Sequence, residues 1–108
     1  ELNAAIPGVL WNLGLLAERQ NQGDEAEKYF TRLASGPGEW EEAHFRLGCL
    51  WLNREDWVQA VEAFEACLKK RRDWPEAEIN LGIAYWKFGD LETAEEHLNR
   101  GLAGQAGS

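Results

Sequence analysis

The sequence predicts an all-α protein built from three copies of one two-helix unit. Three landmarks recur every 34 residues without insertion: a Leu-Gly pair, an alanine twelve residues after the glycine, and a bulky residue four residues later. They are Leu13-Gly14, Ala26 and Phe30; Leu47-Gly48, Ala60 and Phe64; and Leu81-Gly82, Ala94 and Leu98. The 108 residues equal six plus three times 34, so the copies account for nearly the whole chain. Self-similarity at such a period is typical of a repeat architecture.

Each copy contains signals for two helices joined by a turn. The first copy, residues 7–40, follows a lead-in of residues 1–6 and begins with Pro7, which suits the first position of a helix. Its turn is expected at residues 22–24, where Asp24 places an acid at the start of the second helix, which suits capping and the positive end of the helix dipole. The segment 35–38, Ser-Gly-Pro-Gly, separates this copy from the next.

The second and third copies, residues 41–74 and 75–108, repeat this plan. Their turns are expected at residues 54–56 and 88–90, each ending in an aspartate, and Pro75 opens the third copy. Apolar residues at spacings of three and four follow the last turn, as an amphipathic helix requires. The sequence therefore predicts six short antiparallel helices.

The glycines of the Leu-Gly pairs lie inside helices, where each costs about 0.5–1 kcal/mol relative to alanine. Three such glycines at one spacing indicate that helices approach closely there. We expect each to face the repeated alanine of its own copy: Gly14 with Ala26, Gly48 with Ala60, and Gly82 with Ala94.

This pattern resembles the tetratricopeptide repeat, a 34-residue helix–turn–helix unit, over all but six residues of the chain. The family's tyrosine after Leu-Gly is matched by Tyr85, and Ala17 and Trp51 replace it in the other copies. Cys67 and Gly101 stand where the family usually has alanine. The resemblance implies a right-handed superhelix and a non-catalytic protein–protein interaction module, whose concave surface is lined by the first helix of each repeat.

Mapped onto this sequence, the concave positions are mostly apolar, which favours an apolar peptide or helix of a partner protein as the ligand. The alternative is that part of this set belongs to the core, where aromatic stripes at helical spacing usually lie. Trp51, Trp57 and Tyr85 are assigned to packing between helices. The candidate partner-binding residues are Trp11, Leu15, Phe45, Cys49, Leu52, Ile79, Ile83 and Trp86.

Acidic residues are expected to form a rim on this surface and to favour basic residues beside the apolar core of the partner. The rim comprises Glu39, Glu41, Glu42, Asp73, Glu76 and Glu78, with Glu42 and Glu76 as its principal members. A subset of the family holds chaperone C-termini in a carboxylate clamp of Lys, Asn and Arg. The clamp positions here are Trp11, Leu15, Arg46, Glu76 and Asn80, so no chaperone clamp is expected.

Composition excludes several other classes. Nineteen acidic and eleven basic residues give a net charge of -8, which disfavours nucleic acid and acidic membrane surfaces. No apolar run approaches the roughly 20 residues of a bilayer span, and no basic start and apolar stretch indicates a signal peptide. We expect no membrane insertion and a cytoplasmic location. The four basic residues 69–72 are interpreted as the end of a helix, where the dipole favours cations.

Catalytic and metal-binding patterns are not expected either. Cys49 and Cys67 lack Cys-x-x-Cys spacing, which favours reduced thiols, and His44 and His97 lack the spacing of zinc ligands. Neighbouring carboxylates point to different helix faces, so they do not form an acid/base pair. We therefore expect no enzyme activity, no metal and no cofactor.

Two alternative functions remain open. The chain begins without Met and ends in a Gly-rich segment, residues 101–108, too short for a capping helix. The outer faces of the terminal repeats would then be bare, so we expect either a longer parent protein or stacking of copies into a homo-oligomer. A self-association module is therefore one alternative. The other is a regulatory or scaffold arm of an attached enzyme such as a transferase, supported only by fold analogy.

Overall fold

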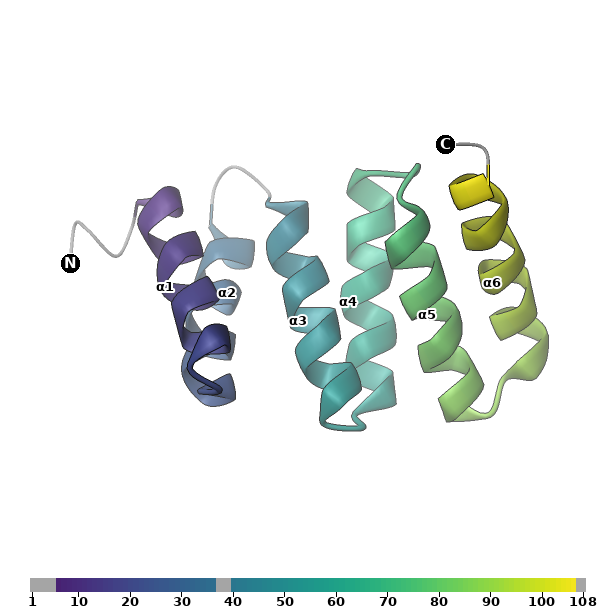
Figure 1. Cartoon of the computed structure of the whole chain (residues 1–108), viewed down its shortest axis with the longest axis horizontal. Helices are drawn as coiled ribbons and strands as arrows, with labels where there is room; N and C mark the ends of the chain where they lie inside the picture. Colours follow the sequence, from purple (N-terminus) through teal and green to yellow (C-terminus); the bar gives the residue numbers. More distant parts are fainter. Residues whose placement is uncertain (1–5, 37–39, 107–108) are drawn as a thin grey trace.

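The computed structural model describes residues 6–36 and 40–106, and Figure 1 shows them as a row of helices. The described residues form six helices and no strand. Taken two by two, the helices make an all-α superhelix of three helix–turn–helix units, with overall dimensions of 45 × 27 × 21 Å. The helices are α1 (Pro7–Arg19), α2 (Gly23–Ser35), α3 (Glu41–Asn53), α4 (Trp57–Lys70), α5 (Pro75–Phe88) and α6 (Leu91–Ala106).

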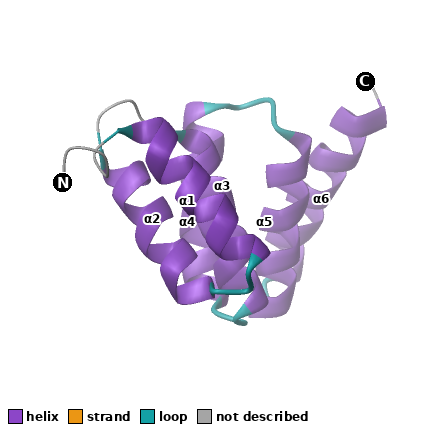
Figure 2. Cartoon of the chain, turned by 60° about the vertical axis from the view of Figure 1, so that its left-hand side comes forward, coloured by secondary structure: helices purple, strands orange, loops and turns teal. Residues whose placement is uncertain are grey.

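The first helices α1, α3 and α5 form one layer, and α2 and α4 lie behind them (Figure 1). Neighbouring helices run in opposite directions and are joined by short loops (Figure 2). The core is continuous between units, because each first helix after α1 packs against the second helix of the preceding unit. Among the described residues, no helix combines the length and apolar character needed to cross a bilayer.

The turns within the units follow one geometry. The residue two positions before each second helix has positive φ: 59° at Asn21, 63° at Glu55 and 109° at Gly89. Asp56 then accepts a hydrogen bond from Gln59 N at 3.4 Å, and Asp90 accepts one from Thr93 N at 3.2 Å.

The predicted cap at Asp24 is wrong. The left-handed residue in the first turn is Asn21, so α2 begins at Gly23 and the capping position falls on Gln22, which makes no side-chain capping bond. Asp24 instead lies in the first turn of α2. Its carboxylate forms an ion pair with Arg54 of the next unit at 2.9 Å.

In all three units the atom nearest to a Cβ added at the helix glycine belongs to the bulky residue of the second helix. A Cβ on Gly14 would lie 2.5 Å from the ring of Phe30, and one on Gly48 would lie 2.7 Å from the ring of Phe64. In the third unit the nearest atom is Leu98 Cγ at 2.7 Å, although the Ala94 carbonyl oxygen also lies within 3.1 Å. The glycines therefore make room for the bulky residue, and in the third unit the backbone of the predicted Ala94 also lies against Gly82.

The Gly-rich end of the chain is helical up to residue 106. Within this helical end, Gly101 lies close against α5: a Cβ there would lie 2.6 Å from Ile79 Cγ1 and 3.0 Å from the Pro75 carbonyl oxygen. Close approach of α6 to the start of α5 therefore requires glycine at position 101.

Candidate protein-binding surface

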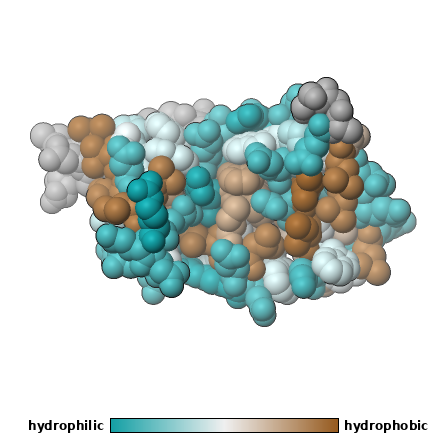
Figure 3. Space-filling model, viewed as in Figure 1, coloured by the Kyte–Doolittle hydropathy of each residue, from teal (hydrophilic) through white to brown (hydrophobic). Residues whose placement is uncertain are grey.

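The eight predicted partner-binding residues all lie on α1, α3 and α5, which are side by side in Figure 1. We call this set the first-helix surface: Trp11, Leu15, Phe45, Cys49, Leu52, Ile79, Ile83 and Trp86. All but Trp86 are half-buried, whereas Trp86 is 53% exposed. In the same view, hydrophobic and hydrophilic residues are interspersed across the molecule (Figure 3). Seven of the eight therefore belong partly to the core and partly to the surface.

Trp11 lies at the N-terminal end of the first-helix surface and is held by rings. Its centroid is 5.6 Å from that of Phe30 and 6.0 Å from that of Trp40. The Arg46 guanidinium lies over the same ring at 5.8 Å and forms an ion pair with Glu18 at 3.3 Å. Burial raises the pKa of Glu18 above its usual value, and Arg46 only partly opposes that effect.

Phe45 occupies the equivalent place in the second unit. It packs edge-on against Phe64 at 5.6 Å and stacks on Trp74 with centroids 4.9 Å apart and planes inclined by 15°. Trp40 and Trp74 are the last residues of the first and second units, and each contacts an aromatic residue on the first helix of its own unit. Sequence reasoning missed both tryptophans, although their spacing of 34 residues is visible in the sequence.

The two cysteines are protonated thiols with structural contacts. Burial raises the pKa of Cys49 to about 11 and that of Cys67 to about 12. The Asn80 amide donates to Cys49 Sγ at 3.9 Å, and the Cys67 thiol donates to the Glu41 carbonyl oxygen at 3.4 Å. Since a thiolate is the nucleophilic form, neither cysteine is suited to nucleophilic chemistry.

The third unit divides the candidate residues. Ile79 packs against Gly101 of α6, and Ile83 remains half-buried on α5. Trp86 lines a hollow of about 440 Å³ with residues of α6, at the C-terminal end of the superhelix. The structure therefore places Trp86 with that end of the molecule.

The predicted acidic rim is only partly present. Glu42, Asp73 and Glu76 are exposed, Glu41 is half-buried, and Glu39 lies outside the described residues. The assignment of Glu78 to the rim is wrong. Its side chain is buried, with 7% exposed, and its carboxylate lies 2.8 Å from His97 Nδ1.

Comparison with known proteins settles the family. The family model described as "Tetratricopeptide repeat" matches residues 52–108, more than half of the chain. The chain belongs to the tetratricopeptide repeat family. Superkiller complex protein 3 from Homo sapiens is 29% identical over 85 residues, which cover 79% of this chain and 5% of that protein. Its Mus musculus counterpart is 31% identical over 84 residues, and these cover 78% and 5%. The chain thus spans about 5% of the length of these relatives.

Solved tetratricopeptide-type structures share the fold. A crystal structure of MamA is 18% identical with a TM-score of 0.90, and the match covers 97% of this chain and 61% of MamA. MamA 41-end from Desulfovibrio magneticus RS-1 is 19% identical with a TM-score of 0.87, covering 96% and 59%. BtubC from P. vanneervenii is 20% identical with a TM-score of 0.81, covering 94% and 47%. These likenesses establish the arrangement of helices.

At the positions of this tetratricopeptide repeat chain that correspond to the carboxylate clamp, several side chains are engaged within the molecule. Arg46 already pairs with Glu18, and Glu76 presents a negative charge to solvent. Trp11 and Leu15 pack against the core at two other clamp positions.

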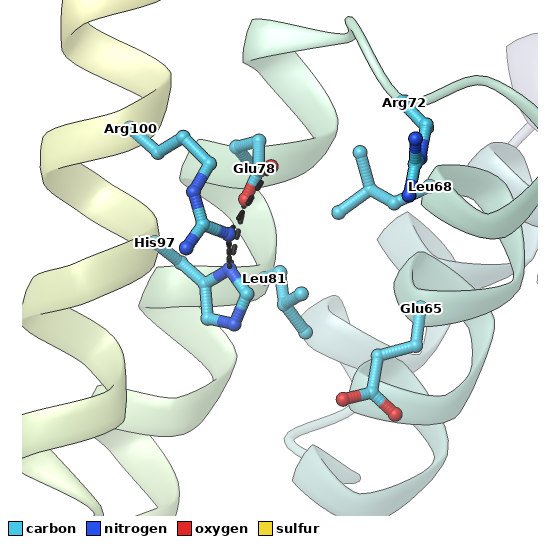
Figure 4. Close-up of a pocket in the computed structure, with 7 residues that line it drawn as sticks. All are labelled: Glu65, Leu68, Arg72, Glu78, Leu81, His97 and Arg100. Atoms are coloured by element: carbon cyan, nitrogen blue, oxygen red, sulfur yellow. Dashed lines mark hydrogen bonds and ion pairs between the residues drawn. The ribbon is translucent and has the colours of Figure 1, made fainter.

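A polar pocket of about 330 Å³ lies between α4, α5 and α6 (Figure 4). Arg100 reaches the Glu78 carboxylate at 3.6 Å beside His97, so these charges connect α5 to α6. The Tyr85 hydroxyl donates to Glu65 at 2.7 Å, and burial together with this bond raises the pKa of Tyr85 to about 12. Among the described residues, no three His, Cys, Asp or Glu side chains are grouped to hold a metal.

The assignments of Trp51 and Tyr85 to packing between helices agree with these contacts. Trp51 packs against two of the core clusters, and Tyr85 packs against one of them and stacks on His97 at 5.6 Å. Trp57 is half-buried at the start of α4.

Proposed function

We propose that this protein-interaction module binds, without catalysis, an apolar peptide or amphipathic helix of a partner protein along the first-helix surface. The observation that carries the proposal is the row of seven half-buried apolar side chains beside the exposed carboxylates Glu42 and Glu76. Repeat superhelices characteristically present extended surfaces of this kind to their ligands. The relative named Superkiller complex protein 3 is, by its name, a member of a complex.

The aromatic residues on this surface are suited to act as anchors. Trp11 and Phe45 are already oriented by neighbouring rings, so binding would immobilise little additional side-chain freedom. Burying their remaining exposed apolar area contributes about 25 cal/mol per Å². A partner with two or three apolar residues on one face could use both rings.

Charge determines which apolar partner is favoured. The chain carries a net charge of -8, and Glu42 and Glu76 open α3 and α5 next to the apolar row. Basic residues flanking the apolar core of the partner would be attracted to these carboxylates. Since the carboxylates are exposed, salt should screen the attraction.

The proposal is tested with two synthetic amphipathic peptides that share apolar positions but carry lysine or glutamate on the polar face. Fluorescence anisotropy should show that the lysine peptide binds more tightly and that binding weakens as salt rises. The double variant Glu42→Lys, Glu76→Lys should weaken binding of the lysine peptide. Its control is Glu92→Lys, Glu96→Lys, which changes the net charge equally through exposed residues of α6.

Equal weakening by both variants would show that only net charge matters and would contradict a site on the first helices. Binding of neither peptide would contradict the proposal as a whole. Phe45 and Ile79 are poor positions for such tests, because Phe45 stacks on Trp74 and Ile79 packs on Gly101.

A further inference from the structure

The two ends of the superhelix carry most of the exposed large apolar side chains. Seven such side chains are exposed among the described residues, and five of them lie at the ends. Ile6 and Leu16 are 48% and 46% exposed at the N-terminal end, where Leu13 and Leu16 line a hollow of about 290 Å³. We define the N-terminal end face as Ile6, Val9, Leu13 and Leu16.

At the other end, α5 and α6 leave a hollow of about 440 Å³ that is lined mainly by apolar side chains. Trp86, Leu91 and Leu102 are 53%, 61% and 56% exposed there. Apolar side chains of the third unit gather at this end of the molecule in Figure 3. We define the C-terminal end face as Ile79, Trp86, Leu91, Ala94, Leu98 and Leu102.

The two internal interfaces show what covers such faces. Leu47 of α3 packs into one core cluster with Ala26 and Phe30 of the preceding unit. Thirty-four residues later, Leu81 of α5 packs into a cluster with Ala60 and Phe64. The same 34-residue step leads from Ala60 and Phe64 to Ala94 and Leu98 on the C-terminal end face. Their missing partner corresponds to Leu13, because Leu13, Leu47 and Leu81 are equivalent.

One further contact follows the same correspondence. At the start of α2, a Cβ on Gly23 would lie 3.9 Å from Leu50 Cδ2. The equivalent residues are Leu91 and Leu16, both of which are exposed. In each case an apolar residue of one end face matches an apolar residue of the other.

We propose that a second copy of this chain places its α1 against α5 and α6, head to tail, and thereby continues the superhelix by one 34-residue step. The interface joins two different faces, so every assembly retains one free face of each kind and association is open-ended. One internal polar pair, Tyr85 with Glu65, has the uncharged equivalents Ala17 and Asn99 at this junction.

Charge gives this interface a salt dependence opposite to that of the proposed peptide site. Two copies with a net charge of -8 repel each other, while the matched faces are mainly apolar. Salt shortens the Debye length from about 10 Å at 0.1 M to about 3 Å at 1 M and so screens this repulsion. Self-association should therefore strengthen with salt.

Sedimentation velocity on the 108-residue chain tests the proposal. The average mass should rise with protein concentration between about 10 µM and about 1 mM, a range suited to small, weak interfaces. Leu16→Glu at one end and Leu91→Glu at the other should each remain monomeric. Val58→Glu is the matched control, since it adds the same charge at a side chain 53% exposed away from both end faces, and it should associate like the original.

Mixing the two monomeric variants distinguishes head-to-tail contact from other self-association. Leu16→Glu keeps an intact C-terminal end face and Leu91→Glu keeps an intact N-terminal end face, so the mixture should form a dimer and nothing larger. Circular dichroism checks that both variants retain their helices. Monomeric behaviour of the original chain at all concentrations, association of either variant alone, or no dimer on mixing would each overturn the proposal.

Discussion

Replacing Gly48 with alanine tests whether close packing between α3 and α4 depends on the absence of a side chain. The added methyl group would lie 2.7 Å from Cε1 and Cζ of Phe64. Phe64 is completely buried, and its ring is held edge-on by Phe45. The ring therefore has no free space into which it could move, and α3 or the ring must shift.

Two opposing effects decide the magnitude. Alanine gains about 0.8–1 kcal/mol over glycine in a helix interior. Overpacking a core typically costs about 1–3 kcal/mol. For a rigid, fully buried ring we expect the upper part of that range, and a net destabilisation of about 1–2 kcal/mol. In a domain of this size each kcal/mol lowers Tm by about 4–8 °C, so the expected fall in Tm is about 4–16 °C.

Urea and thermal unfolding followed by circular dichroism provide the measurement, at protein concentrations low enough to keep the chain monomeric. Gly8→Ala is the control, because Gly8 also lies in a helix and nothing lies within 4 Å of its added Cβ. It should stabilise the chain by up to about 1 kcal/mol, since only helix propensity changes. A Gly48→Ala variant stabilised as much as Gly8→Ala would refute the steric reasoning.

Three further predictions follow from burial. Trp74→Ala should lower the free energy of unfolding by about 3–5 kcal/mol, because the ring is buried. Trp86→Ala removes an exposed ring and should change the free energy of unfolding of the monomer by less than about 0.5 kcal/mol. Urea unfolding measures both. Because the pKa values of Cys49 and Cys67 are about 11 and about 12, a thiol reagent at pH 8 should modify both slowly in the folded chain and rapidly in denaturant. Equally fast modification in both states would contradict this prediction. The pKa of Tyr85 is about 12 in the folded chain and 10 in the unfolded chain. The free energy of unfolding should therefore fall as pH rises between these values. Tyr85→Phe should lack that fall. The same pH dependence of stability in the variant and the original chain would contradict the role of Tyr85.

The regular parts of the fold could be predicted because they depend on local spacing. The first helices begin at residues 7, 41 and 75, and the second helices at 23, 57 and 91, always 34 residues apart. The cap at Asp24 was predicted wrongly because an acid near a turn suits both the capping position and the first turn of the helix, and the sequence does not distinguish the two. Only the positive φ at Asn21 places the start of α2 two residues earlier in the turn than expected.

The candidate site was less predictable than the helices. Helical spacing assigns a residue to a face but not to a depth, so Trp11 and Phe45 could be placed on the first helices while their contacts with Trp40 and Trp74 could not. For the same reason Glu78 resembled a rim residue in the sequence, although it is buried.

What the sequence alone determined is the repeat: its period, its six helices and the membership of each apolar residue in a first or second helix. These features depend on interactions among residues close along the chain. The tertiary structure decided which side chains remain available after packing. It showed that Phe30 and Phe64 fill the space left by Gly14 and Gly48, and that the ends remain apolar and exposed. Those outcomes depend on distances between units, because one unit buries its apolar face only when the next unit covers it.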